Sequence, residues 1–183
     1  MYAGHVGIAL GLRRARSAPA LWLLVIASQL PDWGDALLDL YGDRPADAAW
    51  GPHGWPLVGV GALGVAIVGA RLTRTWRGGI LAALACVSHW CADFLTGWKP
   101  TWPGGPDNVG LGWYAHAPRD FVLESAVTLV GWLLWRGSLP RTTSEESASY
   151  SWRGALEWAL LVALVLMQLA VDAVMAKHGV GQP

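Results

Sequence analysis

Two pairs of ionisable residues stand inside apolar stretches of this sequence. His89 and Asp93 are four residues apart, and Asp32 and Asp35 are three apart, so on a helix the members of each pair share one face. An ionisable side chain inside a membrane span costs roughly 2.5–3.5 kcal/mol on insertion scales and usually marks a functional site. These pairs are therefore the first candidates for chemistry.

Three further residues extend this set. His5 lies in the opening apolar stretch, His53 precedes a later one, and Glu124 lies near the start of another. Imidazole and carboxylate groups together suit a divalent transition metal such as Zn²⁺, Mn²⁺ or Fe²⁺. Such an ion would offset the cost of holding several carboxylates in a medium of low dielectric constant, and it could activate water for hydrolysis. We predict zinc first, with manganese and iron as alternatives.

The composition indicates a membrane protein. The chain has 183 residues, of which 54% are hydrophobic and 14% are charged, and its mean hydropathy is +0.35. Soluble domains average about 25% charged residues, so this chain lacks the charge to cover a water-exposed surface. Its formal net charge is zero, which gives no basic surface for nucleic acid.

Six apolar stretches could form helices, and we expect one all-α membrane bundle with five or six passes over residues 1–183. A spanning helix needs about 20 mostly apolar residues. The last and fourth stretches meet this requirement clearly, the third is short and rich in glycine, and the first is only about half a span. A polar stretch, 137–153, is predicted to be a flexible linker. The six stretches are 2–12, 18–40, 54–70, 78–97, 120–136 and 155–176.

The positive charges predict an orientation. Most of the thirteen Lys and Arg residues fall in alternating connections, the first, third and fifth. The positive-inside rule places these connections in the cytoplasm, and the pattern favours six segments with the first as a genuine pass. Residues 41–53 and 98–118 then face the opposite side. The arginines in the three connections are Arg13, Arg14, Arg16, Arg71, Arg74, Arg77, Arg136, Arg141 and Arg153.

This orientation depends on the arginines and not on the His and acidic residues, yet it brings those residues to a similar depth in the membrane. All of them fall at or near the outer half of the membrane, whichever direction their segment runs. Placements that converge from separate segments are typical of one shared site.

The chain resembles bacterial inner-membrane proteins known as membrane-bound metal-dependent hydrolases. The matching motifs follow the family's order over about two thirds of the chain: GHVGIALG (4–11), ASQLPDWGD (27–35), GPHGWPLVG (51–59), SHWCADFLTG (88–97) and WPGGPDNVGLGWY (102–114) leading to RDFVLES (119–125). The resemblance implies a metal or catalytic set of His5, Asp32, His53, His89 and Asp93. Glu124 matches an acidic position that recurs in small members.

The leading hypothesis is a multi-pass enzyme of the cell inner membrane. It would hydrolyse a lipid or lipid-linked substrate near the extracytoplasmic face, with Glu124 and Asp35 as candidate catalytic residues and Glu124 as general base. The expected partners are the lipid bilayer and that substrate, with no nucleic acid.

Two other functions fit the same residues. The cluster could bind an ion or relay protons in a transporter or channel, although no internal repeat suggests alternating access. Alternatively, a metal with four protein ligands could only hold helices together in a scaffold. The sequence contains neither a P-loop nor a Gly-x-Ser-x-Gly elbow.

Overall fold

The chain folds into a bundle of α-helices. A computed structural model describes residues 3–42, 45–105, 108–139 and 147–178. Two 3₁₀ turns and one isolated β-bridge accompany the helices, and no longer strand occurs in these ranges. The fold class is therefore all-α, as predicted. In chain order the elements are α1 (Ala3–Leu12), α2 (Leu21–Tyr41), η1 (Ala48–Trp50), α3 (Trp55–Thr73), α4 (Trp76–Thr96), η2 (Trp113–Ala115), α5 (Ala117–Gly137) and α6 (Ser147–His178).

Three segments of the described chain are long and apolar enough to cross a membrane: Ala48–Thr73, which contains α3, Trp76–Thr96, which is α4, and Gly154–Val174 within α6. Helix α3 also exposes Leu63 and Ile67, which suits contact with lipid. Helices α2 and α5 have 21 residues each, or about 31 Å at 1.5 Å per residue. They do not reach the same hydropathy, since both carry buried or half-buried acids.

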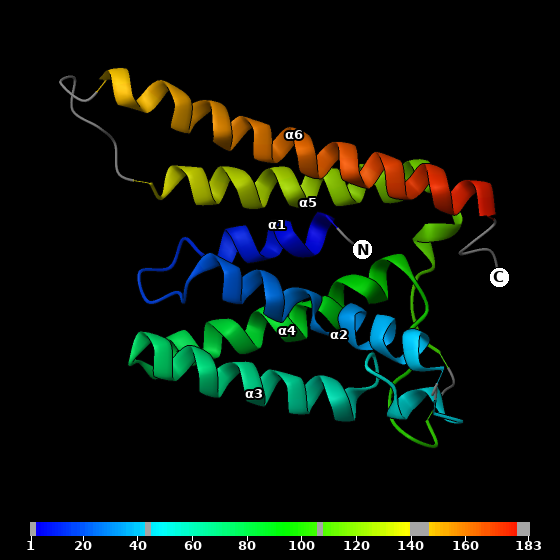
Figure 1. Cartoon of the computed structure of the whole chain (residues 1–183). Helices are drawn as coiled ribbons and strands as arrows, with labels where there is room; N and C mark the ends of the chain where they lie inside the picture. The colour runs from blue at the N-terminus through cyan, green and yellow to red at the C-terminus, as the bar shows by residue number, and fades with distance from the viewer. Residues whose placement is uncertain (1–2, 43–44, 106–107, 140–146, 179–183) are drawn as a thin grey trace.

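Helix α1 is shorter than the full first pass that the six-pass prediction requires. It has ten residues, about 15 Å at 1.5 Å per residue, which is half the thickness of a bilayer core of about 30 Å. Figure 1 shows α1 inside the bundle, beside α5 and α2. It also packs against α4 and α6. The helix ends just before Arg13 and Arg14, whose charges stop an apolar segment from continuing.

Part of the linker expected at 137–153 is helical. Gly137 is the last residue of α5, and α6 already begins at Ser147. Residues 140–146 of that predicted linker lie outside the described residues.

The direction of three helices decides where their functional residues meet. Helices α2 and α4 run the same way along the bundle, and α3 runs the opposite way. The later part of α2, the start of α3 and the end of α4 therefore lie toward one end (Figure 1). Helix α4 packs against α3, α2 and α1, which makes it the central element of this end.

A glycine permits the close approach of α1 to α5. A Cβ atom added to Gly7 would lie 2.6 Å from the Cα of Thr128 and 2.8 Å from the carbonyl oxygen of Val127. Both neighbours are backbone atoms, so they cannot move aside as a side chain would. Small residues at such contacts are typical of helices packed in lipid.

We predict that Gly7→Ala destabilises the protein by roughly 1–3 kcal/mol, because overpacking forces the two backbones apart. Thermal unfolding of the detergent-solubilised protein measures the change. Gly64→Ala in α3 is the matched control, since a Cβ atom there meets nothing within 4 Å. Equal unfolding temperatures for the two variants would contradict this account of α1 packing.

Candidate metal centre

Four of the predicted ligands converge at the end of the bundle described above. One ligand atom from each of Asp32, His53, His89 and Asp93 lies within 4.8 Å of the others. Asp32 comes from α2, His53 directly precedes α3, and the remaining two come from α4. Three elements therefore contribute to one cluster, in which His89 and Asp93 are almost completely buried.

The distances within this cluster match those of a metal coordination shell. Nε2 of His53 lies 3.1 Å from Nε2 of His89, 3.3 Å from Oδ1 of Asp32 and 3.3 Å from Oδ2 of Asp93. Nε2 of His89 lies 3.5 Å from Oδ1 of Asp32 and 3.2 Å from Oδ2 of Asp93. Ligand atoms at about 2.0–2.2 Å from a tetrahedral zinc lie about 3.3–3.6 Å apart. Three of the five separations fall in this range, and the two shorter ones, at 3.1 and 3.2 Å, lie just below it.

The backbone of α2 fixes the ring of His89. Pro31 lies inside this helix, and a proline there lacks an N–H and distorts the preceding turn. In that turn, the carbonyl oxygen of Ser28 lies 2.7 Å from Nδ1 of His89. A carbonyl oxygen only accepts, so Nδ1–H must donate, and in the neutral imidazole Nε2 then has a lone pair directed into the cluster.

Asp35 fixes the ring of His53 in the same way. Its Oδ2 lies 2.8 Å from Nδ1 of His53, so Nδ1–H donates to the carboxylate, and in the neutral imidazole Nε2 again presents a lone pair. Metal-bound histidines commonly have a carboxylate or a backbone carbonyl on the other ring nitrogen. The cluster has one partner of each kind. Asp35, predicted to be catalytic, therefore orients a ligand.

These tautomers make the cluster a site for a cation. Two imidazole lone pairs and two carboxylate groups point at one small volume, and such groups repel one another unless a positive charge lies among them. The donor set of nitrogen and oxygen atoms suits zinc, and it also suits manganese or iron. The residues thus fit a divalent metal ion by chemistry as well as by distance.

His5 lies beside the four converging residues. Its Nε2 is 3.2 Å from Oδ1 of Asp93, whereas the rings of His53 and His89 lie nearest to the other carboxylate oxygen, Oδ2. Its ring is stacked on that of His89, with centroids 3.8 Å apart. His5 therefore contacts a different carboxylate oxygen of Asp93 than the other two histidines do. The sequence predicted His5 as a direct ligand, but it is not among the four residues whose donor atoms converge.

Glu124 is not brought into the cluster. Its Oε2 accepts a hydrogen bond of 2.9 Å from the backbone N–H of Gly4, at the start of α1. Nearby, Gln168 accepts from the backbone N–H of Ala3 at 3.3 Å and donates to Asp172 at 2.7 Å. Glu124 thus belongs to a second buried polar group that anchors α1 to α5 and α6. The four donor atoms that lie within 4.8 Å of one another do not include an oxygen of Glu124.

Lys99 also belongs to the site, although its position in the sequence does not indicate this. Its Nζ lies 2.7 Å from Oδ2 of Asp93, and the side chain is only 19% exposed. No periodic pattern marks this residue, because it follows the end of α4. The sequence shows only that a lysine follows Asp93 by six residues. It does not show that the chain turns so as to bring this lysine back to Asp93.

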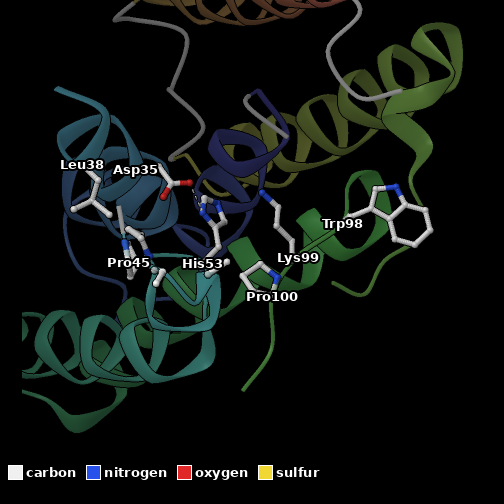
Figure 2. Close-up of a pocket in the computed structure, with 11 residues that line it drawn as sticks. Asp35, Leu38, Pro45, His53, Trp98, Lys99 and Pro100 are labelled. Atoms are coloured by element: carbon white, nitrogen blue, oxygen red, sulfur yellow. Dashed lines mark ion pairs between the residues drawn. The ribbon is translucent and has the colours of Figure 1, made fainter. Parts of the chain in front are cut away.

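A cavity of about 290 Å³ opens beside the cluster. Figure 2 shows Asp35 and His53 pointing toward one another, with the Lys99 side chain near the same ring. Leu38 and Pro45 form an apolar part of the wall. Of the four cluster residues, His53 lines this cavity, so a small molecule would reach the cluster from the side of His53. The remaining lining residues are Ala46, Ala48, Gly51, Pro52, Trp98 and Pro100.

Comparison with protein-family models, with curated proteins and with solved structures gives no match to this chain. The resemblance to membrane-bound metal-dependent hydrolases thus stays a prediction.

We predict that Asp35→Asn weakens zinc binding by about 10- to 100-fold, as loss of an outer-shell partner typically does. The amide can still accept from Nδ1 of His53, but it no longer supplies negative charge. Competition with a chromophoric chelator measures the affinity. Asp39→Asn, one turn further along α2, is the matched control. Equal zinc affinities for both variants would refute an orienting role for Asp35.

Proposed function

We propose that the protein is a metal-dependent membrane hydrolase that acts on a lipid or lipid-linked substrate near the extracytoplasmic face. The observation that carries this proposal is the set of five separations between 3.1 and 3.5 Å that join four donor atoms. The cavity beside His53 would let a substrate approach this side of the cluster.

Each residue of the site has a role in this proposal. Asp32, His53, His89 and Asp93 hold the ion, which when bound acts as a Lewis acid and acidifies water. The carboxylate of Asp35 and the carbonyl of Ser28 keep both imidazoles in the ligating tautomer. His5 donates from Nε2 to Oδ1 of Asp93, so that the other oxygen of this carboxylate faces the cluster.

The position of the cavity suits a lipid head group. Its walls come from the ends of helices and from the loops between them, and Trp50 and Trp98 nearby are more than half exposed. Exposed tryptophans favour the interface between membrane and water. The arginine pattern supports placing this end of the bundle on the side opposite the cytoplasm.

One observation favours a second candidate, a metal that only holds helices together. Four protein donors complete a tetrahedral shell, and closed shells are typical of structural zinc, whereas catalytic zinc keeps one position for water or substrate. The cavity argues for the enzyme, because a purely structural site needs no opening. A catalytic ion with these four ligands would become five-coordinate when it binds a further oxygen.

Hydrolysis tests the proposal directly. Zinc-loaded protein in detergent micelles is expected to release product from at least one class of lipid ester or phosphate, and His89→Ala is expected to reduce the rate to that of the empty micelles. Glu157→Gln, which alters an ion pair with Arg136 away from the cluster, should keep the wild-type rate. Zinc-loaded protein that hydrolyses no ester or phosphate would leave the structural metal as the better explanation.

A further inference from the structure

Lys99 is the one lysine or arginine among the described residues that line the cavity. Lysine is rarely buried unless it is paired, and this side chain is mostly enclosed with its Nζ 2.7 Å from Asp93. The site therefore includes a positive charge that belongs to the protein itself.

The backbone holds Lys99 in place. Its N–H donates to the carbonyl of Val109 at 2.8 Å, and its carbonyl accepts from the N–H of Val109 at 2.8 Å. The returning chain is also attached to the end of α4, since the N–H of Leu111 donates to the carbonyl of Phe94 at 2.8 Å. The ammonium group therefore projects from a fixed segment toward the cluster.

Charges around the cavity explain what a fixed ammonium group would do. Three carboxylates, those of Asp32, Asp35 and Asp93, face a divalent ion in the proposed centre, which leaves one negative charge uncompensated. Lys99 removes this excess, so an anion approaching through the cavity is not repelled. Without Lys99, the same site would repel an anion and would favour a neutral substrate.

The two cations of the site also prefer an anion between them. A divalent ion and the Lys99 ammonium would both approach Oδ2 of Asp93, and like charges at that distance repel. A phosphate group has several oxygens, so one can reach the ion while another accepts from Nζ. A neutral carboxylic ester offers only one strong acceptor. Clamps of a metal ion and lysine are common on phosphoryl groups.

We propose that Lys99 is a substrate-binding residue and that the substrate is an anionic phosphate ester. This inference rests on the hydrolase proposed above. Hydrolysis of such an ester forms a bond from the water oxygen to phosphorus and breaks the bond from phosphorus to the alcohol oxygen. The alcohol leaves with a proton from the water. A cavity of about 290 Å³ is near the lower limit of ordinary ligand pockets, so it admits the head group and leaves acyl chains outside.

Binding of phenylphosphonate, which cannot be hydrolysed at its carbon–phosphorus bond, tests this inference by isothermal titration calorimetry on the zinc-loaded protein in detergent. Lys99→Met is expected to weaken binding by about 10- to 100-fold, the usual effect of losing a hydrogen bond to a charged group. Lys99→Arg should retain most of the affinity. Lys177→Met, which changes the only other lysine of the sequence, should bind as the wild type does.

Zinc content separates substrate binding from a structural role. Lysine at this position donates and supplies no ligand atom, so Lys99→Met should keep its zinc. Unchanged phosphonate affinity in zinc-loaded Lys99→Met would overturn the inference. The wild type alone gives a second test, which does not depend on the variant folding. It should bind phenylphosphonate at least ten times more tightly than the uncharged dimethyl ester, and equal affinities would also overturn the inference.

Turnover distinguishes this inference from the hydrolase proposal. Phosphonate binding that depends on Lys99, without hydrolysis of any substrate, would support the anion site and refute the hydrolase. Alternatively, the protein could hydrolyse p-nitrophenyl butyrate faster than p-nitrophenyl phosphate, at a rate that Lys99→Met does not change. This result would support the hydrolase and refute the anion site. Faster hydrolysis of phosphatidylglycerol than of glycerol phosphate identifies a lipid source, and the opposite order identifies a soluble ester. Either order supports the phosphate class.

Discussion

The repulsion between buried ligand atoms is the constraint on which the site depends. Both imidazoles have their Nδ1 atoms held by other groups, so in the neutral form their Nε2 lone pairs point inward, and the carboxylates of Asp32 and Asp93 share the same volume. Burying such groups together is strongly unfavourable unless a cation lies between them. A divalent ion satisfies all four at once, and Lys99 compensates the remaining charge. The cluster is therefore understood as one unit and not as a set of separate hydrogen bonds.

The architecture brings these groups to one end of the bundle. Helix α4 contributes two ligands one turn apart, α2 supplies one, and the segment just before α3 supplies the fourth at the same end. Short α1 fills the interior beside them and carries His5 to Asp93. Polar contacts of Glu124 and Gln168 with the first turn of α1 hold this helix in place. The second buried polar group thus fixes α1, and α1 in turn places His5 against Asp93 of the metal cluster.

Much of this arrangement could be predicted from the sequence. Apolar stretches gave the helices to within a few residues, except that α6 begins earlier, at Ser147. The spacing of His89 and Asp93 correctly placed them on one face. The pattern of arginines and apolar stretches also predicted a similar position along the bundle for Asp32, His53 and this pair. That prediction grouped the four residues together.

The sequence patterns predict how far along the bundle a residue lies, but not which neighbours its side chain faces. The differences between the predicted and the observed site come from this limit. Glu124 has a similar expected depth, but it faces the start of α1 because packing, not hydropathy, sets the rotation of α5. The spacing of residues also could not show that His5 contacts Oδ1 of Asp93 and not Oδ2. Lys99 was missed because its place depends on the bridge to Val109, a pairing across a loop that has no periodic signal.

The most direct test of this account is the metal content of the purified protein beside that of His89→Ala and Asp93→Ala. Elemental analysis after zinc loading and removal of free metal is expected to give about one ion per wild-type chain and close to none in either variant. X-ray absorption should show nitrogen and oxygen ligands at about 2.0–2.2 Å. Wild-type protein without metal after loading, or folded variants that retain it, would contradict the central claim that these side chains form one metal centre.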